Sequence, residues 1–202
     1  MASKKPDETI FAIVLAAGSA SRFGATKQLA EFDGVPLVQR AMAIANAVCA
    51  ANTVLVVGHE WPAVSRCCDP LQGFLLLNED FAAGMGGSLA AAVSAVRHAA
   101  RAVVVLLADQ VLITADHVQA LCDAWSGSDD EIVATAYGGV TGAPVLFPRA
   151  CFDDLMSLSG DSGGRQLLSD DRFSLRPVEF EAAAVDIDTP DDLMQTSRNA
   201  RS

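Results

Sequence analysis

Short apolar runs rich in β-branched residues alternate along the chain with longer segments that mix apolar and polar positions. The short runs predict strands at 10–16, 53–57, 74–77, 102–107, 132–136, 145–147 and 173–176. The longer segments predict helices at 36–50, 61–68, 87–100, 114–125, 149–158 and 164–168, and a last helix that begins near Thr189-Pro190. Glycines at 138, 139 and 142 predict a loop over 137–142. This alternation favours an α/β domain with a largely parallel sheet.

The length of 202 residues suits one domain, with no repeat or low-complexity linker. We expect a disordered lead at 1–8, a single domain at 9–196 and a C-terminal tail at 197–202. No apolar run approaches the roughly 18 residues needed to span a bilayer. Pro6, Asp7 and Glu8 interrupt any signal-like start, so we expect no membrane association and a cytoplasmic protein. Five cysteines without metal-ligand spacing suggest reduced thiols.

The charge of the chain limits the kind of partner. A formal net charge of −11 argues against nucleic acid as a ligand, because phosphate backbones bind basic surfaces. The same charge creates an unfavourable field for any small anion. An anionic ligand would therefore need local cations and a bound metal.

Such cations follow the first strand directly. The run Ile10–Ala16 opens into a loop of small residues with Gly18, Arg22, Gly24 and Lys27. Glycines let backbone N–H groups approach an anion closely, and Arg and Lys add full positive charge. We interpret this loop as a polyphosphate site in which Lys27 faces solvent. An ordinary strand–loop–helix turn with surface cations is the alternative.

Two common phosphate loops do not fit. A Walker loop needs Gly-x-x-x-x-Gly-Lys-Ser/Thr, which the spacing from Gly24 to Lys27 does not match. A dinucleotide fingerprint needs Gly-x-Gly-x-x-Gly, whereas Gly18 is followed by Ser19, Ala20 and Ser21. The loop therefore belongs to another class of phosphate site.

Carboxylates lie at two later points of the chain. Asp109 follows the most hydrophobic strand, where ligands of open α/β sheets bind, and one such carboxylate with phosphate oxygens suits Mg²⁺. The alternative is that Asp109 caps the following helix. Asp186 and Asp188 would point to one side of a strand, as a second metal ligand or as part of a helix N-cap. The helix dipole alone accounts for Asp191 and Asp192.

Three glycine-containing segments complete the candidate site. Gly84-Met85-Gly86-Gly87-Ser88 introduces a helix and can hold a base or ribose through main-chain groups; a plain flexible loop is the alternative. Two later segments stand out, at 141–147 and 160–165. In the second, Arg165 could bind a second phosphate-bearing substrate, although exposed arginines are usually only solvated.

Taken together, these segments resemble the molybdenum cofactor cytidylyltransferase branch of the MobA-like NTP transferase family. The resemblance runs from Ile10 to Met194. It is carried by Leu15-Ala16-Ala17-Gly18 with Arg22, Phe23, Gly24 and Lys27, by Gly84-Met85 before Ser88-Leu89, by Asp109-Gln110, by Gly142-Ala143-Pro144 with Val145-Leu146-Phe147-Pro148, by Gly160-Asp161 with Gly163 and Arg165, and by Asp186-Ile187-Asp188 with Thr189-Pro190-Asp191-Asp192-Leu193. Ala17 matches the cytidylyl pattern, because the guanylyl branch tends to have a second glycine there.

The resemblance implies a Rossmann-like three-layer α/β/α fold of the nucleotide-diphospho-sugar transferase type, with a mostly parallel seven-stranded sheet. It implies catalytic roles for Arg22, Lys27 and Asp109, and Mg²⁺ held by Asp109 with Asp188, or with Asp186 as the alternative. The expected nucleotide-binding residues are Leu15, Ala16, Ala17, Gly18, Arg22, Gly24, Lys27, Gly86, Gly87 and Ser88. The expected acceptor-binding residues are Arg165, Gly142 and Pro144.

The implied reaction is attack of an acceptor phosphate on a nucleoside triphosphate, with release of pyrophosphate. The favoured pair is CTP and molybdopterin, with a molybdoenzyme or its maturation factor as a possible protein partner. The alternatives are a sugar- or alditol-phosphate nucleotidyltransferase and a non-catalytic carrier of a nucleotide or molybdenum cofactor. The sequence departs from the family pattern at Ala108 and Val111 beside Asp109, at Ala143, and at Gly86-Gly87, where the family has a pair of serines. These departures leave the base and the acceptor open.

Overall fold

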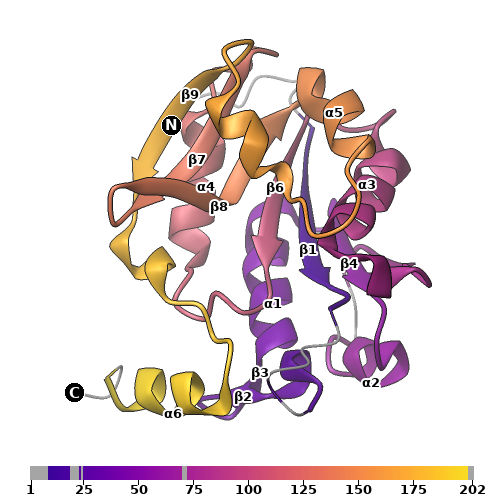
Figure 1. Ribbon diagram of the computed structural model, residues 1–202, viewed down its shortest axis with the longest axis vertical. Helices are drawn as coiled ribbons and strands as arrows, with labels where there is room; N and C mark the ends of the chain where they lie inside the picture. Colours follow the sequence, from indigo (N-terminus) through magenta and orange to yellow (C-terminus); the bar gives the residue numbers. More distant parts are fainter. Residues whose placement is uncertain (1–8, 19–22, 24, 70–71, 200–202) are drawn as a thin grey trace.

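A seven-stranded sheet forms the centre of the computed structural model, which describes residues 9–18, 23, 25–69 and 72–199. The strands lie in the order β5-β4-β1-β6-β8-β7-β9 (Figure 1). They are β1 (Ile10–Ala16), β4 (Thr53–Val57), β5 (Phe74–Leu77), β6 (Ala102–Leu107), β7 (Glu131–Tyr137), β8 (Val140–Pro148) and β9 (Ser174–Glu179). Neighbours are parallel except where β8 pairs with β6 and β7. The predicted mostly parallel sheet is confirmed.

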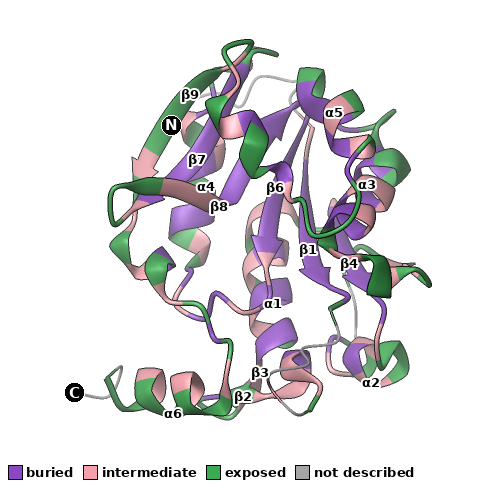
Figure 2. Ribbon diagram, viewed as in Figure 1, coloured by how far each residue is buried: buried purple, intermediate pink, exposed green. Residues whose placement is uncertain are grey.

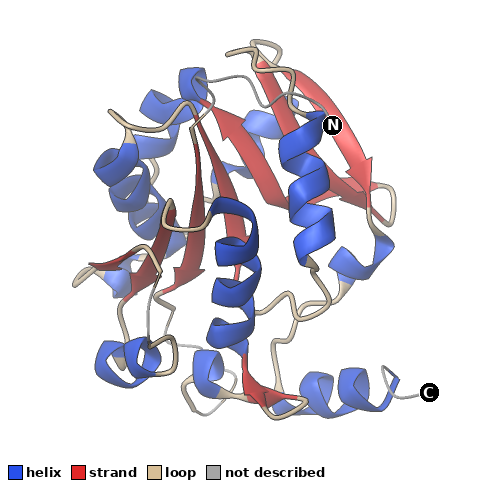
Figure 3. Ribbon diagram, turned by 180° about the vertical axis from the view of Figure 1, so that it is seen from behind, coloured by secondary structure: helices blue, strands red, loops and turns tan. Residues whose placement is uncertain are grey.

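Helices cover both faces of this sheet. Figures 1 and 3 show α3 and α5 on one face and α1 and α4 on the other, which makes the three-layer α/β/α arrangement. The helices are α1 (Leu37–Cys49), α2 (Trp61–Arg66), α3 (Met85–Val96), α4 (Ala115–Ala124), α5 (Phe152–Met156) and α6 (Pro190–Asn199). Short 3₁₀ segments are η1 (Lys27–Leu29), η2 (Phe81–Ala83), η3 (Arg149–Cys151), η4 (Gly164–Ser169) and η5 (Glu181–Ala184), and β2 (Glu31–Phe32) pairs with β3 (Val35–Pro36).

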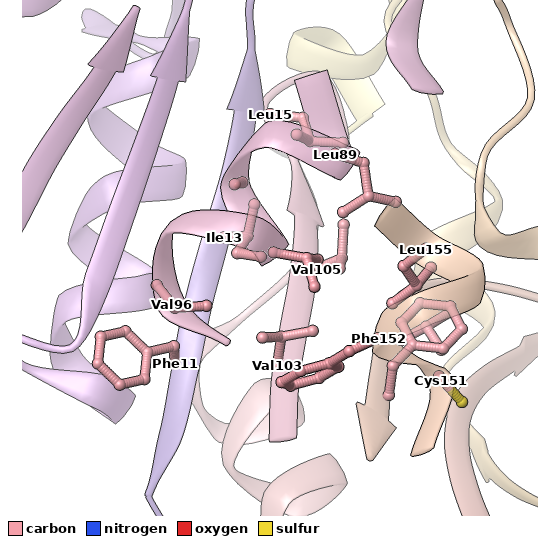
Figure 4. Close-up of a cluster of buried hydrophobic side chains, with 14 of the residues drawn as sticks. Phe11, Ile13, Leu15, Leu89, Val96, Val103, Val105, Cys151, Phe152 and Leu155 are labelled. Carbon is pink, nitrogen blue, oxygen red and sulfur yellow. The ribbon is translucent and has the colours of Figure 1, made fainter. Parts of the chain in front are cut away.

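The core is divided between the two faces because successive side chains of a strand point to opposite sides. From β1, Phe11, Ile13 and Leu15 join a cluster with residues of α3 and α5, such as Leu89 and Leu155 (Figure 4). The intervening β1 residues at 12, 14 and 16 pack in a second cluster with α1 and α4. Full burial of a large apolar side chain such as Ile13 or Val14 contributes about 1.5–3 kcal/mol. The carboxyl end of β1 is thereby held firmly between two packed layers.

The prediction of a loop over 137–142 is wrong. Gly138 and Gly139 both have positive φ, 53° and 77°, and form a two-residue turn between Tyr137 and Val140, which are paired. This geometry matches the strand twist and is readily adopted by two consecutive glycines. Strand β8 therefore begins at Val140, five residues before the predicted start at 145.

Several elements lie beyond the carboxyl ends of β1 and β6. Figure 1 shows β2, β3 and α6 at this end of the molecule. Helix α6 has no buried residue (Figure 2) and continues to Asn199, past the expected domain end at 196. In the part of the chain that the structure describes, no helix has the length and apolarity to cross a bilayer.

Candidate nucleotide site

A cavity of about 350 Å³ opens where β1 and β6 end. Its wall combines main chain after β1, side chains of η1, the start of α3 and the end of β6. The lining residues are Leu15, Ala17, Gly18, Lys27, Gln28, Leu37, Phe81, Ala82, Gly84, Met85, Ser88, Leu107, Ala108, Asp109 and Asp161. This is the edge at which open α/β sheets bind their ligands.

Lys27 links two of the predicted metal-binding carboxylates. Its Nζ lies 2.8 Å from Oδ2 of Asp109 and 3.0 Å from Oδ1 of Asp188. Burial lowers the pKa of Lys27. The charges and hydrogen bonds of Asp109 and Asp188 together raise it by more than burial lowers it, so the pKa lies above its usual value. The expectation that Lys27 faces solvent is wrong: its side chain is only 12% exposed, because η1 turns it toward the end of β6.

Asp109 keeps one oxygen without a partner. Its Oδ1 is buried and accepts no hydrogen bond from any residue in the described part of the chain. Helix α4 is capped instead by Thr114, whose side chain accepts a hydrogen bond from the backbone N–H of His117. Asp109 is therefore not a helix cap. An unpartnered buried carboxylate oxygen is costly unless a ligand supplies the missing charge or donor.

The segment 185–188 brings two further carboxylates to Asp109. The N–H of Ile187 donates to the main-chain oxygen of Asp109 at 3.2 Å, and the Ile187 side chain is fully buried. Asp186 and Asp188 therefore flank a fixed point at the end of β6. The expected strand is absent in this described segment, which carries no ladder pairing. Burial, followed by the charges of Asp109 and Asp188, raises the pKa of Asp186 to about 6.

Helix capping at α6 uses other residues than Asp186 and Asp188. Asp192 Oδ2 accepts hydrogen bonds from the N–H groups of Asp188 and Thr189, and Thr189 Oγ1 accepts one from the N–H of Asp192. This is a reciprocal capping box. The Asp188 carboxylate is thus free of capping and points toward Lys27.

These carboxylates suit a magnesium ion in part. In the described residues, no group of three or more His, Cys, Asp or Glu side chains is arranged to hold a metal. Asp109 and Asp188 nevertheless meet at Lys27, and Asp109 has an oxygen to spare. Mg²⁺ is commonly bound by one or two carboxylates, with phosphate oxygens and water completing its coordination. The donor set therefore fits an ion that arrives with a phosphate ligand.

Gly86 and Gly87, both predicted to bind the nucleotide, have different surroundings at the start of α3. A Cβ on Gly86 would lie 2.7 Å from the main-chain oxygen of Ser162, and the Gly86 N–H donates to Gly160. A Cβ on Gly87 would meet no atom within 4 Å. Gly86 is therefore closed in by the 159–162 loop, whereas Gly87 is open. Ser88 lines the cavity and its hydroxyl accepts a hydrogen bond from Asn78.

The main chain after β1 is held by a residue that the sequence did not single out. Gln28 is buried, and its side-chain amide donates to the main-chain oxygen of Gly18 at 2.6 Å. Leu15, Ala17 and Gly18 line the cavity, whereas Ala16 packs into the core on the other face. Only its position beside Lys27 could have pointed to Gln28. Arg22 and Gly24 lie outside the described residues.

A second cavity of about 970 Å³ adjoins the first and shares Met85 and Asp161 with it. Arg165, which the sequence predicts as an acceptor-binding residue, lines this second cavity. Gly142 and Pro144 do not line it. Gly142 lies beneath the ring of Tyr137, which belongs to β7 and not to the predicted loop over 137–142. The Pro144 carbonyl accepts a hydrogen bond from Thr135.

Comparison with known proteins gives the family. The MobA-like NTP transferase domain matches residues 12–177, and the chain belongs to this family. It is therefore a nucleotidyltransferase of the MobA-like type. The chain is 28% identical to the molybdenum cofactor cytidylyltransferase of Escherichia coli K12 over 186 residues, which cover 90% of this chain and 92% of that protein.

Two further relatives widen the comparison. The purine catabolism protein PucB of Bacillus subtilis 168 is 27% identical, covering 91% of this chain and 93% of that protein. The crystal structure of Rv0371c from Mycobacterium tuberculosis H37Rv in complex with manganese has a TM-score of 0.78 at 25% identity, covering 94% and 98% of the two chains. A divalent metal ion therefore accompanies this fold in a solved relative.

Proposed function

We propose that this MobA-like nucleotidyltransferase transfers CMP from CTP to the phosphate of molybdopterin or its metal-loaded form, releasing pyrophosphate and using Mg²⁺. The observation that carries the proposal is the convergence of Lys27, Asp109 and Asp188 at the cavity where β1 and β6 end. A lysine paired with two carboxylates can exchange these partners for a phosphate chain and its metal ion. The finer choice of base and acceptor follows the resemblance described above.

Lys27 is the proposed ligand of the triphosphate. Its ammonium is held by carboxylates at 2.8 and 3.0 Å, so it is already aimed at the end of β6 before any ligand arrives. An ammonium so placed stabilises negative charge that grows on the leaving pyrophosphate. Arg22 is proposed to share this role, although it lies outside the described residues.

Asp109 and Asp188 are the proposed holders of Mg²⁺, with Asp186 as the alternative to Asp188. When bound, such an ion supplies Lewis-acid polarisation of phosphate oxygens. The carboxylates would hold the ion, and the unpartnered Oδ1 of Asp109 would be available as a ligand. The manganese complex of the mycobacterial relative supports a divalent ion at this fold.

Main chain and small side chains are the proposed nucleoside contacts. Leu15, Ala17 and Gly18 line the smaller cavity together with Ser88. Gly87, with free space around it, is proposed to admit the ligand at the start of α3, whereas Gly86 is closed by the 159–162 loop. Exposed main-chain groups read the edges of a base through hydrogen bonds.

The acceptor needs no activating base in this proposal. A phosphate oxygen is already an anion near neutral pH, so its attack on the α-phosphorus depends on position and charge neutralisation. The adjoining cavity, which shares Met85 and Asp161 with the nucleotide cavity, is the proposed place for the acceptor. We further propose that the reaction takes place in the cytoplasm and that the product passes to a molybdoenzyme or its maturation factor.

Pyrophosphate release is the test. The purified protein is given each NTP with Mg²⁺ and, in turn, molybdopterin or sugar and alditol phosphates. Pyrophosphate release that requires both CTP and molybdopterin supports the proposal. We expect chelation of the metal to abolish this release. Release with a polyol phosphate identifies a different acceptor. Binding of CTP or molybdopterin without release identifies a carrier and overturns the proposal.

A further inference from the structure

The larger cavity contains one aromatic hydroxyl that no hydrogen bond of the described residues uses. The cavity is lined by parts of β7, β8, β9 and the segment 161–169, and Tyr137 stands in its wall at the end of β7. A volume of about 970 Å³ accommodates a molecule of cofactor size. A hydroxyl in such a wall is a candidate contact for the second substrate.

The fold holds this hydroxyl over a particular glycine. A Cβ built on Gly142 would clash with Tyr137 Oη and would lie 3.2 Å from its Cζ, a tight contact. The two-residue turn at Gly138-Gly139 folds β8 back along β7 and so brings Gly142 beneath the ring. The phenol of Tyr137 therefore packs directly on the main chain of Gly142, where a side chain would not fit.

Two charges act on the same hydroxyl. Burial raises the pKa of Tyr137 most, the charge of Asp186 raises it further, and the charge of Arg165 partly offsets these effects. Tyr137 therefore keeps its proton near neutral pH, and its hydroxyl can donate a hydrogen bond to an anion. Tyr137 and Arg165 line the same cavity, and the charge of Asp186 also reaches the hydroxyl.

From this placement we infer that Tyr137 binds the phosphate of the acceptor, its hydroxyl donating a hydrogen bond while Arg165 supplies the positive charge. The inference rests on the proposed function, because it names a residue for the second substrate of that reaction. It adds Tyr137 to the acceptor-binding residues that the sequence predicts, because the fold brings Tyr137 into the same cavity as Arg165.

The remaining charges of the cavity favour this position for the phosphate. Asp161 and Glu179 also line the wall, and their carboxylates repel an anion. Arg165 is the only cationic side chain among the described lining residues of this cavity. An acceptor phosphate is thus directed toward Arg165 and Tyr137, and the polar groups of Thr141, Ser162 and Gln166 remain for the rest of the molecule.

The test compares Tyr137→Phe with the wild-type protein in the CTP–molybdopterin assay. Loss of one hydrogen bond to a charged group raises the KM for molybdopterin by about 10- to 100-fold. We expect the affinity for CTP and Mg²⁺, measured by calorimetry without acceptor, to stay unchanged. Ser157→Ala is the matched control. It also removes one hydroxyl, which donates a hydrogen bond to the main-chain oxygen of Asp154, and Ser157 lines neither cavity.

A double-mutant cycle tests the link to Gly142. Gly142→Ala pushes on the phenol oxygen and should raise the same KM, whereas adding it to Tyr137→Phe should cost little more, because the clashing oxygen is gone. Wild-type turnover with an unchanged KM in Tyr137→Phe overturns the inference alone. A wild-type protein that neither binds nor converts molybdopterin overturns the inference and the proposed acceptor together. Additive effects of the two substitutions contradict the proposed geometry.

Discussion

Lys27 Nζ lies 2.8 Å from Asp109 Oδ2, although 82 positions separate these residues in the chain. The pair joins the segment after β1 to the end of β6, and Asp188 joins it from the far end of the chain. One ammonium thus pairs with two carboxylates. The charges that repel one another in the free protein are also those expected to bind a metal–nucleotide complex.

Replacing Lys27 by Met should reduce both catalysis and stability. We expect kcat/KM for CTP to fall by about 100-fold or more, as when one charge-stabilising group is removed. Because the lysine is 12% exposed and its partners 30% and 61%, we also expect a loss of about 1–3 kcal/mol of unfolding free energy. Pyrophosphate release and urea unfolding measure the two effects.

Arg101→Met provides a matched control for that substitution. Arg101 forms an exposed ion pair with Asp129, at 3.4 Å, and lines neither the nucleotide cavity nor the larger one. Its loss should change stability by less than about 1 kcal/mol and leave turnover intact. Wild-type turnover in Lys27→Met would show that the lysine has only a structural role.

Asp109→Asn and Asp188→Asn should weaken binding of the divalent ion. Each change removes one negative charge but keeps the shape of the side chain, so we expect the affinity for Mn²⁺ with CTP to fall by about 10-fold or more. Titration followed by electron paramagnetic resonance measures this directly. Asp191→Asn, on the first turn of α6, is the control. A larger effect of Asp186→Asn than of Asp188→Asn would select Asp186 as the second ligand.

Asp186 should make stability depend on pH in the absence of metal. Its pKa in the folded protein is raised from 3.8 to about 6, so the folded state keeps the proton where the unfolded chain has lost it. Its stabilising contribution is therefore complete below about pH 4 and is lost as the pH rises through about 6.

The variant Asp186→Asn lacks this loss. At about pH 7 it should be more stable than the wild type by about 1 kcal/mol, a value kept small because water still reaches this partly desolvated carboxylate. The difference should vanish below about pH 4. Urea unfolding across this range, with chelator present, gives the comparison. A difference that grows on acidification contradicts the raised pKa.

Gly86→Ser and Gly87→Ser form a matched pair at the start of α3. A side chain at Gly86 meets main-chain atoms of Ser159 and Ser162 below 3.0 Å, so this change should cost about 1–3 kcal/mol. Gly87 has open space, so its substitution should be neutral or slightly stabilising in a helix. Melting temperatures rank the two. Equal losses would show that the 159–162 loop yields easily.

Much of the fold was determined by the sequence itself. Strands β1, β4 and β6 begin and end where the apolar runs predict, because a strand buried on both faces is apolar along its whole length. The edge strand β5 also begins and ends as predicted, although none of its residues is fully buried. Thr114 and Thr189 were predicted at the starts of helices, since helix capping depends on residues a few positions apart. The start of β8 was missed because a pair of glycines predicts a loop and a tight hairpin turn equally well.

The site was only partly determined in this way. The sequence indicated Lys27, Asp109 and Asp188 by type, but not that one ammonium would join both carboxylates, and it placed Lys27 in solvent. It gave no sign that Tyr137 lies over Gly142 or that Gly86 and Gly87 differ in the space around them. Local patterns fix the elements, because hydrogen bonding and burial repeat over a few residues. Contacts between distant segments depend on how the packed layers cross, and only the tertiary structure decides them.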